Sequence, residues 1–200
     1  FSPSSRTGAD DLEPVRDLFR AASRPFLQSP VSWLTWAILL PGAALATPLA
    51  FQLRGPAGVL FAWSAVILVG GAVEVMMIRR SGRKEMGSTL AAWVLRLQGN
   101  LSFVALALSA LLVWQDLAWA LPGLWLLLLG HSFYMLGGLA FPPFRACGLI
   151  FQLGGLIALW PRGNPLLAFA AATAVGNLWM GIGVWRENRR ERAYSSSSNG

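Results

Sequence analysis

Two oppositely charged side chains, Glu74 and Arg96, stand inside apolar stretches and are the residues best suited to chemistry. A charge at the centre of a bilayer costs about 2.5–3.5 kcal/mol, so it usually has a partner or a function. The basic segment 79–84 separates the two stretches, and we expect the helices on its two sides to be adjacent and antiparallel. Because an arginine side chain reaches toward the nearer surface, the sequence predicts that Arg96 pairs with Glu74. The pair would be either a structural clasp or the floor of a cytoplasm-facing site.

Four further polar side chains interrupt the apolar stretches at similar expected depths. They are Asn100, His131, Gln152 and Asn177. One interpretation is a convergent polar cluster, buried with Glu74 and Arg96 and open to the cytoplasm. The other, which we favour for the neutral groups, is that they hydrogen-bond between helices and fix the packing.

The sequence contains no complete catalytic or metal-binding set. His131 precedes Ser132, but there is no G-x-S-x-G motif and no second histidine, which argues against a serine hydrolase. The single cysteine, Cys147, and the single histidine cannot form a Cys₂His₂ or bis-histidine haem site within one chain. We therefore expect no metal, no cofactor and no enzymatic activity, and keep a membrane enzyme with an external cofactor as a third alternative.

The composition places these polar residues in a membrane protein. Of 200 residues, 55% are hydrophobic and 12% charged, whereas a soluble domain has about 25% charged residues. The net charge of +7 comes from basic residues at the ends of apolar stretches rather than along one face, so we exclude nucleic acid as a partner. Only Lys84 among the 16 basic residues is a lysine, which is typical of a GC-rich bacterial genome.

Six apolar stretches are long enough for a membrane-spanning helix, which needs about 20 residues with a range near 17–25. They cover residues 31–53, 57–78, 88–113, 120–140, 143–160 and 164–185. We predict an all-α bundle of six transmembrane helices over 31–186, between an N-terminal arm, 1–30, and a basic, then Ser-rich tail, 187–200. Small residues at four-residue spacing in 42–50, 154–158 and 168–176 predict close helix packing.

Residues 11–24 of the N-terminal arm have apolar residues at helical spacing. They predict a short amphipathic helix. Two placements stay open for it: solvated and packed on the bundle, or lying in the membrane interface.

The basic residues alternate between the two ends of the expected bundle. One end has the arm, the basic anchor (Arg79, Arg80, Arg83 and Lys84), Arg145 and 186–192, whereas the other has only Arg54 and Arg162. The positive-inside rule then predicts a bacterial inner-membrane protein with both termini in the cytoplasm. The excess positive charge at that face suits anionic lipid headgroups.

The second half of the chain carries a resemblance. The segments Leu121–Gly130, Gly137-Gly138, Cys147-Gly-Leu and Gly163-Asn-Pro-Leu-Leu resemble uncharacterised small bacterial six-span membrane proteins of acidobacteria-like genomes, over residues 115–185. Members of that group are often encoded beside winged-helix regulators, which implies a regulatory role. The group has a small residue where this chain has His131, and a proline-containing version of the segment around Arg96.

Two functions follow as hypotheses. The first is a non-catalytic sensory, regulatory or complex-assembly protein with a protein partner or a homo-oligomeric state. The alternative is a small-solute or proton-coupled transporter that uses the polar cluster.

Overall fold

The computed structural model describes residues 29–80, 89–139 and 142–197. Within these ranges all regular elements are helical, which confirms the all-α class. The elements are α2 (Pro30–Arg80), α3 (Thr89–Trp114), the 3-10 helix η2 (Ala118–Ala120), α4 (Leu121–Leu139), α5 (Pro143–Ala158) and α6 (Pro165–Ser197). The predicted amphipathic helix 11–24 and the anchor residues Arg83 and Lys84 lie outside the described residues.

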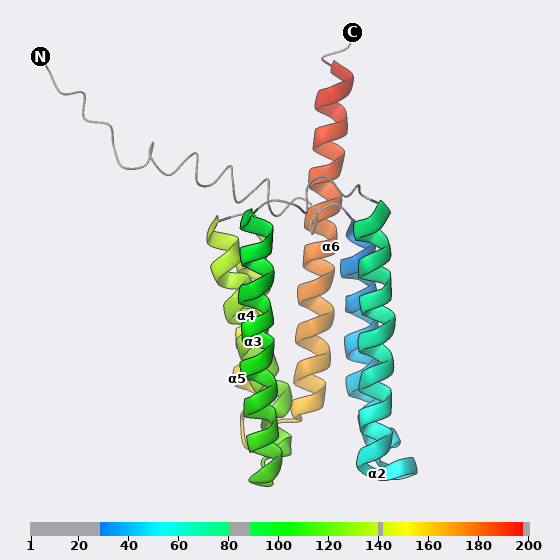
Figure 1. The fold of residues 1–200 in the computed structure, drawn as a ribbon, viewed down its shortest axis with the longest axis vertical. Helices are drawn as coiled ribbons and strands as arrows, with labels where there is room; N and C mark the ends of the chain where they lie inside the picture. The colour runs from blue at the N-terminus through cyan, green and yellow to red at the C-terminus, as the bar shows by residue number, and fades with distance from the viewer. Residues whose placement is uncertain (1–28, 81–88, 140–141, 198–200) are drawn as a thin grey trace, which may run out of the picture.

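Helix α2 is a hairpin of two antiparallel halves, drawn blue and cyan-green in Figure 1. The break lies at Arg54 (φ −141°, ψ 15°) and Gly55 (φ 60°, ψ −150°). Glycine adopts a positive φ without steric cost, and Pro56 has the fixed φ suited to the first turn of the second half. The turn therefore falls between the first two predicted stretches. At Gly58 a side chain would strike the carbonyl oxygen of Ala50, so this glycine brings the two halves close together.

Among the described residues, four helices are long and apolar enough to cross a membrane. Their apolar portions are Pro30–Met77, Arg96–Trp114, Ala118–Gly137 and Pro165–Arg190. Helix α5 is apolar but has 16 residues, about 24 Å at 1.5 Å per residue. The chain thus has the build of a membrane protein, with α2 folded back on itself and α5 shorter than a full span.

The helices pack in the order α3, α4, α5, α6, α2. Helix α4 packs extensively on α5, α5 on α6, and α6 on α2, whereas α3 contacts mainly α4 and η2. Figure 1 shows α3 on the side of the bundle away from α2. The predicted adjacency of the helices on either side of the basic segment is therefore wrong. The stretch from Arg80 to Thr89 can reach roughly 30 Å when extended, farther than the 8–10 Å between packed helices.

Glycines at seven-residue spacing join α4 to α5. A side chain on Gly148 of α5 would lie 2.6 Å from the Gly130 carbonyl oxygen of α4, and one on Gly155 would lie 3.0 Å from that of Gly123. The two backbones are therefore in direct contact along most of α5, as small residues at helix interfaces permit.

Small residues also join α5 to α6. A side chain on Gly154 would strike the Cβ of Ala172, and one on Gly176 would strike the ring of Phe151. The small-residue packing predicted for 154–158 and 168–176 is thus confirmed at these contacts. It is wrong for Gly42, which is exposed and has open space where a side chain would begin.

Two helix pairs share the same hydrogen-bonding arrangement, in which a tryptophan indole donates to a hydroxyl of the preceding helix; we call it a tryptophan clasp. The indole N–H of Trp63 donates to Thr47 Oγ1 at 3.0 Å within α2, and that of Trp125 donates to Ser109 Oγ at 3.1 Å between α4 and α3. Each hydroxyl donates in turn to the carbonyl four residues before it in its own helix. In both pairs, therefore, a tryptophan ties its helix to the preceding antiparallel helix.

Helix α6 is the longest continuous helix of the bundle. Its 33 residues span about 50 Å, and its C-terminal end extends beyond the other helices in Figure 1. The guanidinium of Arg189 lies 4.3 Å from the ring centroid of Trp185, and Arg190 pairs with Glu187 at 4.0 Å. The predicted tail 187–200 is thus helical through Ser197.

Candidate functional site

The carboxyl group of Glu74 has a tryptophan as its partner. The indole of Trp36, in the first half of α2, is its side-chain hydrogen-bond partner. A side chain on Gly70 would strike the same indole ring, so this glycine makes room for Trp36 one turn before Glu74. The carboxyl group is partly buried and is bound within the α2 hairpin.

The predicted pairing of Glu74 with Arg96 is wrong for the described residues. Arg96 lies on α3, which has no extensive contact with α2, and its side chain is exposed. The structure records no ion pair between these two side chains, both of which it describes. The physical reason is the hairpin: Trp36 and Glu74 are equally distant in sequence from the turn at Gly55, so the turn alone brings them level.

Arg96 belongs instead to an exposed face of α3. Arg96, Gly99, Asn100 and Phe103 follow one another at the three- and four-residue spacing that puts residues on one side of a helix. All four are exposed, Phe103 to 70%, and a side chain on Gly99 would meet only open space. We call these four residues the α3 outer face.

The opposite side of α3 holds it to α4. Ala105 is buried there, at 1% exposure, and Ser109 accepts the hydrogen bond of Trp125. Gln98 Nε2 donates to Ser132 Oγ of α4 at 2.6 Å. Since one side of α3 faces α4, the α3 outer face points away from the bundle.

The polar residues of the α3 outer face lie well inside the helix. Arg96 and Asn100 are about 10 Å and 16 Å along α3 from Thr89, at 1.5 Å per residue. Neither side chain has a hydrogen bond or ion pair to another residue in the described part of the chain. They are polar groups within an apolar helix, directed outward.

The remaining predicted cluster residues lie in separate surroundings. His131 is exposed on α4, and its neighbour Ser132 is engaged by Gln98. Gln152 of α5 is half-buried beside Gly130. Asn177 of α6 is 3% exposed and donates to the Thr173 carbonyl oxygen at 2.7 Å.

These surroundings do not form one site. Within the described ranges, no hydrogen bond joins any two of the six residues predicted for the polar cluster. Asn177 bonds within its own helix rather than across helices, because an amide can reach the carbonyl four residues earlier. Nor do three His, Cys, Asp or Glu side chains of the described residues come together in a way that could hold a metal ion.

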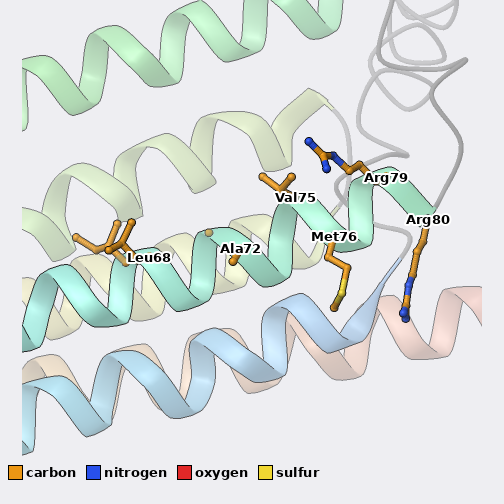
Figure 2. Close-up of a pocket in the computed structure, with 8 residues that line it drawn as sticks. Leu68, Ala72, Val75, Met76, Arg79 and Arg80 are labelled. Atoms are coloured by element: carbon orange, nitrogen blue, oxygen red, sulfur yellow. The ribbon is translucent and has the colours of Figure 1, made fainter.

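A groove runs along the second half of α2. Its apolar walls are Ile67, Leu68, Gly71, Ala72, Val75 and Met76, and it has a volume of about 680 Å³. Arg79 and Arg80, the two described residues of the basic anchor, line its end, as Figure 2 shows. The groove thus combines an apolar surface with two cations.

An aromatic cluster closes the bundle near the start of α2. The ring of Trp33 meets the rings of Phe133 and Phe144 edge-on at 5.8 and 5.7 Å, and Phe151 lies 5.6 Å from Phe133. The indole N–H of Trp33 is buried and has no hydrogen-bond partner among the described residues.

Sequence reasoning missed Trp36 and the two tryptophan clasps. The signal was present: with the turn fixed at Gly55, residues at equal distances from it in sequence lie side by side. The same count that pairs Trp36 with Glu74 also pairs Thr47 with Trp63.

Comparison of the chain with protein-family models, curated proteins and solved structures gives no match. The resemblance of residues 115–185 to small bacterial six-span proteins therefore stays a prediction.

Proposed function

We propose that this chain is a six-span protein of the bacterial inner membrane that acts as an assembly or regulatory partner of another membrane protein. The partner docks on the α3 outer face. The single observation that carries this proposal is the outward exposure of Asn100, inside an apolar helix, beside the open surface of Gly99.

The membrane placement rests on helix length and on charge. In the described part of the chain α3, α4 and α6 are each long and apolar enough to cross a bilayer once. The two halves of α2 would add two crossings and the shorter α5 one, which makes six. Arg79, Arg80 and the basic end of α6 share one end of the bundle, toward which α2 and α6 end in Figure 1. Arg54 lies at the opposite turn of α2. The positive-inside rule supports both termini in the cytoplasm.

The energetics of Asn100 favour a protein partner over lipid. The long side chain of Arg96 can extend toward the headgroups, whereas the short amide of Asn100, about 16 Å from Thr89, stays in the hydrocarbon. An interhelical hydrogen bond of such a group is worth about 1–2 kcal/mol in model peptides. Gly99 lets a second backbone approach the amide closely. A second copy of the chain, or another membrane helix, would satisfy Asn100 there.

Affinity purification of the full chain in mild detergent, at native expression, tests this proposal. We expect the wild-type chain to retain a stoichiometric partner or second copy, and Asn100→Leu to lose it. Ser64→Leu is the matched control, because Ser64 is an exposed polar residue on α2. Recovery of the wild-type chain as a lone monomer, or full retention of the partner by Asn100→Leu, would refute the proposal.

The transporter alternative has no observation in its favour. It requires Glu74, Arg96, His131 and Asn177 to line a common hydrated path. In the described structure Asn177 is buried in α6, Glu74 is bound by Trp36, and Arg96 and His131 are exposed on two other helices.

A further inference from the structure

The groove on the second half of α2 faces away from the bundle. Its walls are exposed: Leu68 to 72%, Ile67 to 59% and Val75 to 49%. The opposite side of the same half-helix is packed, with Gly70 under Trp36 and Trp63 edge-on to Phe169 at 5.6 Å. Among the described residues, therefore, no other helix packs on the groove.

The shape of the groove comes from two small residues between larger ones. Gly71 and Ala72 form its floor, and a side chain on Gly71 would meet only open space. Along the helix Leu68 precedes these two residues and Val75 and Met76 follow them, with the side chains of Val75 and Met76 on opposite sides of the helix, as Figure 2 shows. The result is an open apolar groove along the helix.

Two cations, Arg79 and Arg80, lie at one end of the groove. Arg79 and Arg80 are both exposed, and no described acidic residue pairs with either one. The carboxyl group of Glu74, earlier in the same helix, is bound by Trp36 rather than by these arginines. A guanidinium binds phosphate oxygens through two parallel hydrogen bonds. The groove thus fits an amphiphile with an anionic phosphate head and an alkyl tail.

The length of the groove matches one lipid leaflet. From Ile67 to Arg80 the helix rises about 20 Å, and half of a bilayer with its headgroup region is about 20–22 Å. A phosphate at the arginines would leave the acyl chain beside Gly71 and Ala72.

We propose that this groove is a binding site for one anionic phospholipid of the cytoplasmic leaflet. The proposal rests on the membrane placement given above, but not on the α3 partner. The phosphate lies at the arginine end of the groove, and one acyl chain lies on Gly71 and Ala72. A second copy of the chain fits less well, because two-fold packing of copies with the same orientation would bring four arginines together.

Lipid titration of the purified full chain, followed by native mass spectrometry, tests the site. We expect phosphatidylglycerol to bind more tightly than phosphatidylcholine. The double variant Arg79→Gln/Arg80→Gln should weaken phosphatidylglycerol about thirtyfold, at about fivefold for each lost cation. Arg189→Gln/Arg190→Gln removes the same charge from α6 and is the control, which should bind as the wild type does.

A second variant probes the apolar part of the site. Gly71→Leu fills the groove without changing charge, and we expect it to weaken phosphatidylglycerol severalfold while the monomer mass is retained. Equal binding of the two lipids, equal weakening in the control, or unchanged binding in Gly71→Leu would each overturn the proposal. So would loss of a dimer in Gly71→Leu, which would assign the groove to a second copy. Because Asn100 is untouched in these variants, the lipid site and the α3 partner fail separately.

Discussion

Helices α3 and α5 are both neighbours of α4, but they are held in different ways. Seven of the 16 residues of α5 are buried, and its glycines meet the α4 backbone directly. In the part of α3 whose side chains the structure describes, 96–114, only Ala105 is buried. That helix is attached mainly through hydrogen bonds of Gln98 and Trp125.

The difference shows what fixes a helix in an apolar surrounding. Lipid tails are as apolar as leucine, so a hydrophobic helix gains little by leaving lipid for protein, and close packing decides. Helix α5 has small residues on two sides, facing α4 and α6. Helix α3 has one such contact, at Ala105, and presents Gly99 and Asn100 outward. Helix α5 is therefore the centre of the packing, whereas α3 is the more weakly packed helix, on which we propose that the partner docks.

The largest effect should come from placing the same side chain on each helix. In Gly148→Leu the new Cβ would lie 2.5 Å from the Tyr134 backbone nitrogen and 2.6 Å from the Gly130 oxygen. Because backbone atoms cannot move aside separately, we expect a loss of about 3 kcal/mol, the upper end of overpacking costs. Gly99→Leu on α3 should change stability by less than about 0.5 kcal/mol.

The stability of both variants can be measured as the fraction of chain that stays monodisperse after heating in detergent. Equal loss in the two variants would mean that α3 is packed as tightly as α5.

A smaller effect should follow from removing one phenyl ring on each helix. Phe151 of α5 is 1% exposed and touches Phe133, whereas Phe103 of α3 is 70% exposed. We expect Phe151→Ala to cost about 2 kcal/mol, below the usual 3–5 kcal/mol because little transfer from water is lost. Phe103→Ala should cost almost nothing. Unfolding in a denaturing detergent series would measure the loss of stability in both variants. A larger loss in Phe103→Ala than in Phe151→Ala would mean that α3 is packed more tightly than α5.

The sequence predicted the helical segments closely. The stretch 120–140 corresponds to α4 at Leu121–Leu139, and 143–160 to α5 at Pro143–Ala158. Prolines and glycines at the turns, together with the length of each apolar run, were sufficient. The break between the two halves of α2 at Gly55 could likewise be predicted from the sequence.

Which helices pack against each other could not be predicted from the sequence in the same way. The Glu74–Arg96 pairing assumed that consecutive helices pack together, but the stretch after Arg80 is long enough to carry α3 to the far side of the bundle. The polar cluster assumed that similar depth means contact. Depth fixes only one coordinate, and the direction of each side chain around its helix, inward for Asn177 and outward for Asn100, depends on which helices pack together.

The smallest expected effect separates the two tryptophan clasps. Trp125→Phe removes the hydrogen bond to Ser109, and interhelical bonds of this kind average about 0.6 kcal/mol in a membrane protein. Because α3 has few other contacts, we expect faster amide hydrogen exchange along α3. Trp63→Phe removes the equivalent bond to Thr47, but α2 keeps the close approach at Gly58 and the Trp36–Glu74 bond. Its exchange should change less. Equal acceleration in α2 and α3 would show that the two clasps carry the same share of helix attachment, and that α3 is no more weakly held than α2.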